Sequence, residues 1–130
     1  MSDNAVLKKL YLKPGYRAII LNAPASYQPV IADIPPTVTL ADALAGEFDF
    51  IQVFVVKRAD LEAAAQSLAA ALKPDGLLWA TYPKAKALGT DLKRETVWEA
   101  LQPAGLRPVA QVAIDDTWSA LRFKHDSEGG

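Results

Sequence analysis

Cysteine is absent from this chain of 130 residues, and histidine occurs only once. Without a thiol, the chain cannot form disulfides, a thiolate nucleophile or a cysteine-ligated metal site. The one histidine, His125, falls in a polar stretch at the carboxyl-terminal end, so a serine nucleophile would lack a base. A metal site would need clustered carboxylates, and the pair Asp115-Asp116 is more typical of a hairpin turn. We therefore predict no metal site and no catalytic residue.

The chain also lacks long apolar runs and an excess of charge of either sign. No run approaches the roughly 20 apolar residues that span a bilayer, and the first residues do not form a signal peptide. Lysine and arginine total 14 against 15 acidic residues, and a formal charge of -1 gives no general attraction for nucleic acid or anionic membrane. We expect a cytoplasmic protein with no membrane partner and no general nucleic-acid binding.

A strand, a helix and a second strand dominate the middle of the sequence. Residues 48–56 are rich in β-branched and aromatic side chains and predict a central strand. Asp60 can cap a helix, and apolar residues then recur at helical spacing as far as Leu72. The Pro74-Asp75-Gly76 turn leads into a short apolar strand over 77–81. Two buried strands joined by a helix predict a parallel, right-handed crossover, with an antiparallel α+β pair as the alternative.

The flanking segments extend this pattern in both directions. The predicted elements are a helix over 4–12, a strand over 16–21, a helix from Thr90 or Asp91 to Leu101, and strands over 106–114 and 117–123. Prolines argue against a helix between Tyr27 and Pro35, and residues 38–40 fit either a short strand or the start of a brief helix.

Together these elements predict an α/β fold. We expect a three-layer αβα Rossmann-like sheet that is mostly parallel and ends in a C-terminal antiparallel hairpin. A single domain would span residues 1–124, followed by a polar C-terminal tail over 125–130.

Three short motifs carry a resemblance to a known family. They are Lys13-Pro14-Gly15 before the first strand, Phe48-Asp49-Phe50-Ile51, and the stretch from Leu72 through Pro74-Asp75-Gly76 to Leu78. With the closing hairpin, they resemble a small, truncated class I methyltransferase-like domain. The chain looks most similar to a bacterial family of unknown function with that architecture. The resemblance implies a Rossmann-like fold and S-adenosylmethionine as the cofactor of a catalytic member.

The chain departs from that family where the cofactor would bind. Class I methyltransferases place a glycine-rich loop after the first strand and an acidic residue, which holds the ribose, at the end of the second. Here the loop over 22–27 contains no glycine, and Asp33 cannot be placed at a strand end. About 25 residues separate the first strand from the strand over 48–56, too few for two complete βα units. We therefore predict that part of the cofactor half is missing.

Candidate ligand-binding residues follow from where the predicted strands end. In open α/β sheets, ligands bind outside the carboxyl ends of the strands. The residues at these ends are Asn22, Ser26, Tyr27, Lys57, Arg58, Tyr82, Lys84 and Lys86. The four cations among them predict attraction for a small anion, with ordinary solvated lysines as the alternative. The alternative for Tyr27 is that its ring fills the former cofactor pocket.

We predict a non-catalytic methyltransferase-like domain that binds a small anionic ligand or a protein partner, with no cofactor expected. One alternative is an S-adenosylmethionine-dependent methyltransferase with an atypical cofactor loop. Another is a structural protein that forms homo-oligomers, such as a homodimer, by pairing exposed sheet edges. The sequence leaves open which ligand is bound and whether the basic side chains converge.

Overall fold

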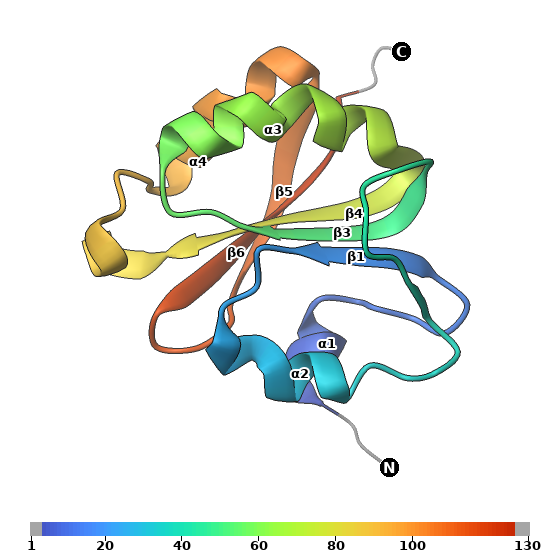
Figure 1. Cartoon of the computed structure of the whole chain (residues 1–130). Helices are drawn as coiled ribbons and strands as arrows, with labels where there is room; N and C mark the ends of the chain where they lie inside the picture. The colour runs from blue at the N-terminus through green and yellow to red at the C-terminus, as the bar shows by residue number, and fades with distance from the viewer. Residues whose placement is uncertain (1–3, 127–130) are drawn as a thin grey trace.

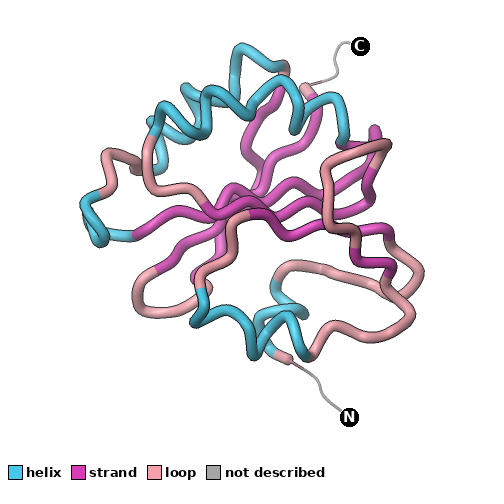
Figure 2. Tube along the Cα trace, in the orientation of Figure 1, coloured by secondary structure: helices cyan, strands magenta, loops and turns pink. Residues whose placement is uncertain are grey.

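The computed structural model describes residues 4–126, apart from the side chain of Lys86. Within this range the chain forms a six-stranded sheet with the strand order β2-β1-β3-β4-β6-β5 (Figures 1 and 2). The strands are β1 (Arg17–Leu21), β2 (Thr39–Leu40), β3 (Phe48–Phe54), β4 (Leu72–Pro83), β5 (Leu106–Ala113) and β6 (Trp118–His125). The helices are α1 (Ala5–Lys9), α2 (Gln28–Ala32), α3 (Arg58–Ala71) and α4 (Arg94–Leu101). Three 3-10 helices are η1 (Ala25–Tyr27), η2 (Lys84–Gly89) and η3 (Gln102–Ala104).

The sheet is parallel on one side and antiparallel on the other. Strands β2, β1, β3 and β4 pair in parallel, whereas β6 runs antiparallel between β4 and β5. Helices α3 and α4 cover one face, and α1 and α2 cover the other (Figure 1). This arrangement confirms the predicted three-layer α/β fold with its closing antiparallel hairpin. None of the helices in the described range is long and apolar enough to cross a membrane.

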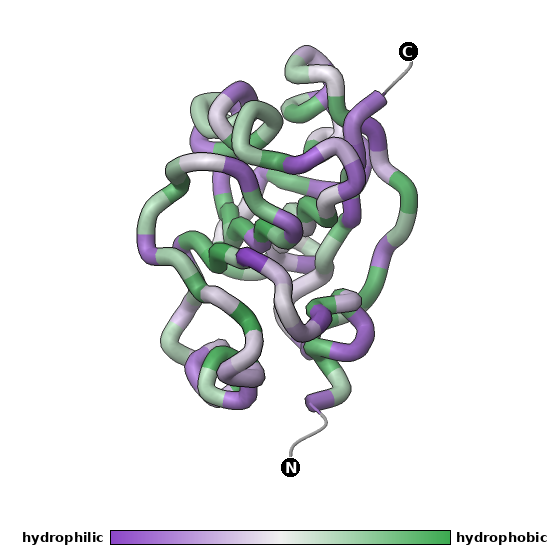
Figure 3. The backbone as a smooth tube through the Cα atoms, turned by 90° about the vertical axis from the view of Figure 1, so that its right-hand side faces the viewer, coloured by the Kyte–Doolittle hydropathy of each residue, from purple (hydrophilic) through white to green (hydrophobic). Residues whose placement is uncertain are grey.

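Alternation along the central strands fills two separate cores. On β3, Ile51 and Val53 face α3 and α4, whereas Phe50 and Phe54 face the side of α1 and α2. Strand β4 alternates in the same way, with Leu78 on the α3 side and Trp79 on the opposite side. Hydrophobic residues accordingly lie along the strands in the centre of the molecule (Figure 3). Burial on both faces explains why apolar residues dominate these strands in the sequence, with the buried Gln52 as an exception on β3.

Two predictions about helices were wrong. A helix between Tyr27 and Pro35 does form, because Pro29 lies in the first turn of α2, where its missing N–H would have had no helical partner. Helix α3 begins at Arg58, so Asp60 lies in its first turn instead of at its cap. An acidic residue there still interacts favourably with the helix dipole.

Helix α4 also starts later than predicted. The Thr90 hydroxyl donates to the Val56 carbonyl and accepts from the Leu92 N–H, and the Asp91 carboxylate accepts from the Arg58 N–H at 2.8 Å. Both side chains therefore form hydrogen bonds within and around the loop that precedes the helix, and neither caps it. The cap is Lys93, whose N–H donates to the Thr96 hydroxyl at 2.8 Å.

The amino and carboxyl ends of the sheet also differ from the prediction. Residues 38–40 contain the short strand β2, so the alternative of a brief helix there was wrong. His125, which the sequence placed in the polar tail, is the last residue of β6, and its Nε2 lies 2.8 Å from the Leu72 carbonyl oxygen.

The predicted Pro74-Asp75-Gly76 turn is a bulge inside β4. Phe48 pairs with Leu72 and Phe50 pairs with Leu77, so the β4 strand accommodates extra residues between these two pairs. Gly76 is required here by close approach, since a Cβ would lie 3.0 Å from the Phe48 carbonyl oxygen and 2.7 Å from Leu72 Cδ1. The backbone of β3 cannot move away from this Cβ without disturbing the centre of the sheet.

We expect Gly76→Ala to destabilise the fold by about 1–3 kcal/mol, because the added methyl group forces the bulge away from β3. Urea unfolding measures this loss. Asp75→Ala is the matched control: Asp75 lies in the same bulge but is exposed, and it should change the free energy of unfolding by less than about 0.5 kcal/mol. Equal effects of the two substitutions would contradict the steric explanation.

The connection from β2 to β3 is a loop over residues 41–47 with no helix. The Arg17 guanidinium donates to the carbonyls of Ala45 at 2.8 Å and Glu47 at 2.7 Å, and it lies 3.9 Å from the centre of the Phe48 ring. The side chain of one β1 residue therefore holds the loop close to the sheet.

Candidate functional site

The centre of the parallel sheet contains a topological switch point. Strands β1 and β3 are neighbours, but the chain continues from β1 to β2 on one side and from β3 to β4 on the other. Helix α2 follows β1 on one face, and α3 follows β3 on the opposite face (Figure 1). In open α/β sheets, ligands bind outside the carboxyl ends of the strands at such a point.

A cavity of about 470 Å³ lies at this position. We call it the switch-point cavity. It is lined by Asn22, residues 53–56, Asp60, Ala64 and Trp118. Its volume falls within the range of about 300–1,000 Å³ that is common for small-molecule sites. The carboxyl end of β3 and the first turns of α3 thus form one wall, and the residue after β1 forms another.

Asn22 has a left-handed backbone conformation with a φ of 59°. Few residues other than glycine adopt it, and asparagine is among those that do so most readily. The loop after β1 therefore makes a turn of the kind that glycine usually allows, although it contains no glycine. The absence of glycine from residues 22–27 argued against a positive φ in this loop, and Asn22 adopts one nonetheless.

Tyr27 is a core residue. Its hydroxyl donates to Gln52 Oε1 at 2.9 Å, and Gln52 Nε2 donates to Thr81 Oγ1 at 3.1 Å. Burial raises the pKa of Tyr27 to about 12, with a smaller opposing effect from the Gln52 hydrogen bond. The ring packs edge-on against Phe54 at a centroid distance of 4.7 Å. Ser26 is exposed on η1 and makes no cap hydrogen bond there.

The switch-point cavity matches one end of S-adenosylmethionine better than the other. The Asp60 carboxylate and the backbone of residues 53–56 suit the ammonium group and chain of the methionine end. Strand β2, however, stops at Leu40, which pairs with Ala18, whereas β1 continues three residues or about 10 Å further. Asp42 follows this short strand, and Asp33 accepts from Asn4 Nδ2 at 2.8 Å. Neither acid lies at the end of a strand that reaches the cavity.

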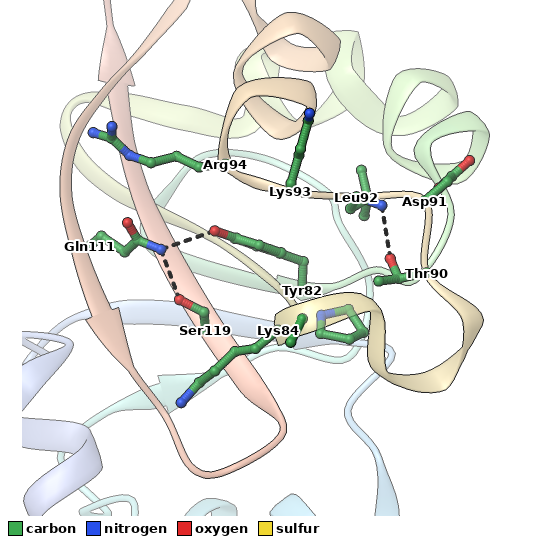
Figure 4. Close-up of a pocket in the computed structure, with 11 residues that line it drawn as sticks. Tyr82, Lys84, Thr90, Asp91, Leu92, Lys93, Arg94, Gln111 and Ser119 are labelled. Carbon is green, nitrogen blue, oxygen red and sulfur yellow. Dashed lines mark hydrogen bonds between the residues drawn. The ribbon is translucent and has the colours of Figure 1, made fainter.

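A second cavity of about 530 Å³ lies beyond the carboxyl end of β4 (Figure 4). We call it the acceptor cavity. Its walls come from the end of β4, η2, the start of α4 and the hairpin strands β5 and β6. Its lining residues are Tyr82, Pro83, Lys84, Ala85, Thr90, Asp91, Leu92, Lys93, Arg94, Gln111 and Ser119.

Three polar side chains form a hydrogen-bonded cluster in the acceptor cavity. Gln111 Nε2 donates to the Tyr82 hydroxyl at 2.9 Å and to Ser119 Oγ at 3.0 Å (Figure 4). Burial raises the pKa of Tyr82, and the hydrogen bonds with Ser119 and Gln111 and the nearby charge of Arg94 oppose that shift only in part. The phenol therefore stays protonated at neutral pH and can act as a hydrogen-bond donor.

A hydrogen bond joins a lining residue of one cavity to a lining residue of the other. Val56 lines the switch-point cavity and Thr90 lines the acceptor cavity, and the Thr90 hydroxyl donates to the Val56 carbonyl. A second contact supports it, because Lys57 Nζ donates to the Gly89 carbonyl at 2.7 Å. The linings of the two cavities thus touch near the carboxyl ends of β3 and β4.

The predicted basic residues do not all reach one place. Lys57 is held by the Gly89 carbonyl, and the Arg58 guanidinium pairs with Glu62 at 2.9 Å and Glu99 at 3.0 Å. Lys84 lines the acceptor cavity together with Tyr82. Lys86 has a side chain outside the described part of the structure. Of the predicted site residues, the structure therefore brings Tyr82 and Lys84 together and places Asn22 in the neighbouring cavity.

Sequence reasoning missed most of the other lining residues. Ser119 pairs directly with Tyr82 across β4 and β6, and Gln111 lies on the next strand. Finding them required the strand order, since a hairpin that follows α4 in sequence returns to lie beside β4. Arg94 was missed because the predicted start of its helix was several residues too early.

These features define the class of the fold. A mostly parallel sheet with a central switch point, closed by an antiparallel strand inserted beside β4, is the Rossmann-like fold of class I S-adenosylmethionine-dependent methyltransferases. The chain has this fold in a small, truncated form.

Solved structures match the chain over nearly its whole length. A putative type 11 methyltransferase from Sulfolobus solfataricus has a TM-score of 0.67 at 10% identity, covering 97% of this chain and 92% of its own. A ribosomal protein L11 methylase from Lactobacillus delbrueckii subsp. bulgaricus has a TM-score of 0.62 at 12% identity, covering 94% and 76%. A TehB-like SAM-dependent methyltransferase from Corynebacterium glutamicum has a TM-score of 0.58 at 12% identity, covering 96% and 90%.

No protein-family model matches the chain, and no curated protein matches it. The similarity to a particular bacterial family therefore stays a prediction. The structural matches contradict our prediction of a non-catalytic domain, because many of the solved structures that share this fold are described as methyltransferases. They also do not support the expectation of no cofactor. The methyltransferase alternative is the better supported of the two.

Proposed function

We propose that the chain is an S-adenosylmethionine-dependent methyltransferase. The cofactor would bind in the switch-point cavity, and the methyl acceptor would bind in the acceptor cavity. The observation that carries this proposal is the contact between Val56, which lines the switch-point cavity, and Thr90, which lines the acceptor cavity. A methyl donor and its acceptor must lie side by side, and these are neighbouring cavities at the edge of the sheet where ligands of such folds bind.

The chain's own residues would divide this work between the two cavities. When bound, the cofactor supplies an electrophilic methyl group on a positively charged sulfur. The backbone at Asn22 and at residues 53–56 would hold its methionine end, and the Asp60 carboxylate would pair with its ammonium group. Thr90 would fix the carboxyl end of β3 and thereby the distance between the two ligands. Tyr82, Gln111 and Ser119 would orient the acceptor.

The structural matches support this proposal. The fold-sharing proteins named above are described as methyltransferases, and the one from Corynebacterium glutamicum is described as SAM-dependent. A cytoplasmic location, a protein partner and a homodimer stay predictions from the sequence.

The test is a thermal melt of the full chain with millimolar S-adenosylmethionine and, separately, S-adenosylhomocysteine. A ligand at 100 times its dissociation constant stabilises the native state by about 2.7 kcal/mol, so we expect the Tm to rise by several degrees. Adenosine at the same concentration is the control. Because no acid at the end of β2 reaches the cavity, adenosine alone should give a much smaller shift. A cooperative melt whose Tm is changed by neither S-adenosylmethionine nor S-adenosylhomocysteine would contradict the proposed function.

A further inference from the structure

We propose, on the basis of the proposed methyl transfer, that the methyl acceptor is a carboxylic acid bound as its carboxylate in the acceptor cavity. The product would be its methyl ester. Three independent observations point to this substrate class. The lining carries an excess of positive charge, the Tyr82 hydroxyl offers a hydrogen-bond donor, and no described side chain of the lining is suited to remove a proton.

The lining carries an excess of positive charge. Lys84, Lys93 and Arg94 contribute cations, and Asp91 contributes the one acid. The Asp91 carboxylate accepts from the Arg58 N–H at 2.8 Å and points away from Tyr82 (Figure 4). Among the residues that the structure describes, neither Lys84 nor Arg94 takes part in an ion pair. Unpaired cations in a concave site attract an anionic ligand.

Arg94 and Lys84 extend on either side of the cluster of Tyr82, Gln111 and Ser119 (Figure 4). An oxyanion bound at the Tyr82 hydroxyl would therefore have cationic side chains on both sides.

Tyr82 offers this oxyanion a hydrogen-bond donor. The Gln111 amide donates to both the Tyr82 and the Ser119 hydroxyls, so each of them is already an acceptor. The Ser119 hydroxyl donates its own hydrogen bond to the Val112 carbonyl at 3.4 Å. Because Tyr82 accepts from Gln111, its hydroxyl can donate its own hydrogen to a ligand, and a carboxylate, which only accepts hydrogen bonds, suits it.

Among the side chains that the structure describes, none that lines the acceptor cavity is suited to remove a proton. Its lining contains no histidine, its one carboxylate is engaged by a backbone N–H, and Tyr82 stays protonated because burial raises its pKa. The chain's single histidine, His125, lies against Leu72, at the opposite end of β4 from Tyr82. Alcohols and amines must lose a proton when they are methylated, whereas a carboxylic acid has already lost it at neutral pH.

The step is balanced without a base. A lone pair of one carboxylate oxygen forms the bond to the methyl carbon as the bond from that carbon to sulfur breaks. The electron pair of the broken bond stays on sulfur, which becomes a neutral thioether, and no proton moves. The second carboxylate oxygen would remain on the Tyr82 hydroxyl. The side chains of Pro83, Ala85 and Leu92 offer apolar contact for the rest of the acid.

The test is a titration of the isotope-labelled full chain, followed by NMR, without cofactor. Benzoate is the probe, benzamide is its neutral counterpart, and phenyl phosphate represents the other common oxyanion. We expect benzoate to shift the backbone amides of Lys84, Arg94 and Ser119 and to bind at least about tenfold more tightly than benzamide. Arg94→Gln and Tyr82→Phe should each weaken benzoate binding by about tenfold, because each removes a hydrogen bond to a charged group.

Arg107→Gln is the matched control, because it removes the same charge from an exposed position at the far end of β5 and should leave benzoate affinity unchanged. Equal binding of benzoate and benzamide, no shifts with either, or equal effects of the two arginine variants would overturn the proposal. Tighter binding of phenyl phosphate would overturn its commitment to a carboxylate.

The two experiments distinguish failure of the proposed methyl transfer from failure of the proposed carboxylate acceptor. Benzoate selectivity without stabilisation by S-adenosylmethionine would reject methyl transfer and keep the oxyanion site. Stabilisation by S-adenosylmethionine without benzoate selectivity would reject the carboxylate acceptor and keep the methyltransferase.

Discussion

Replacing Ala64 with phenylalanine is expected to abolish stabilisation by S-adenosylmethionine and to lower methyl transfer by about 100-fold or more. Ala64 is half-buried on α3 and lines the switch-point cavity. A phenyl ring there would occupy the space proposed for the methionine end of the cofactor. Misplacing a reacting group by about 1 Å already costs about 100-fold, and a blocked cavity displaces it further.

Two comparisons make this result specific. Ala63→Phe introduces the same side chain one residue earlier, at an exposed position of the same helix, and should retain the thermal shift with the cofactor. Benzoate binding should persist in Ala64→Phe, because Ala64 does not line the acceptor cavity. If Ala64→Phe bound S-adenosylmethionine as well as Ala63→Phe did, the cofactor would have to bind elsewhere.

Replacing Trp79 with alanine is expected to destabilise the fold by about 3–5 kcal/mol, the largest effect on stability that we predict. Trp79 is completely buried on β4, and its Nε1 donates to the Leu10 carbonyl at the end of α1 at 3.0 Å. The substitution leaves a large cavity in the core and an unpaired carbonyl group. Domains of this size are stable by about 5–15 kcal/mol, so this variant would be close to unfolding.

Chemical denaturation measures this loss, and two further variants separate its causes. Trp79→Phe keeps most of the apolar volume but not the hydrogen bond, and should cost about 1–3 kcal/mol. Trp98→Ala removes the same side chain from α4, where it is 44% exposed, and should cost far less than Trp79→Ala. Similar losses for Trp79→Ala and Trp98→Ala would show that the core on the side of α1 does not depend on Trp79.

The sequence predicted the elements with strong periodicity. Strand β3 and helix α3 are long, and burial on one or both faces gives them a clear apolar pattern. The errors occurred where local chemistry departs from its usual role. Pro29 lies in the first turn of a helix instead of preventing one, and Pro74-Asp75-Gly76 forms a bulge instead of a turn. Both depend on hydrogen bonds or pairings that only the folded chain reveals.

The candidate site was predictable only where it follows from a single strand. Tyr82 and Lys84 come directly at the end of β4, so the strand-end rule found them. Gln111 and Ser119 reach the same cavity through the antiparallel register of β5 and β6, which the sequence does not specify. The prediction of a non-catalytic domain gave too much weight to the absence of glycine, since Asn22 adopts a left-handed conformation without it.

The short loop between β2 and β3 also bears on how the chain folds. Because residues 41–47 join β2 to β3 without a helix, Ala18 on β1 pairs with Phe50 on β3 only about 30 residues further along the chain. Phe50 in turn pairs with Leu77 at a similar separation. Loop-closure entropy grows with the length of chain enclosed, so the central strands can associate at low entropic cost. Both central pairings therefore close loops of about 30 residues, so the parallel centre of the sheet can form before the two ends of the chain are brought together.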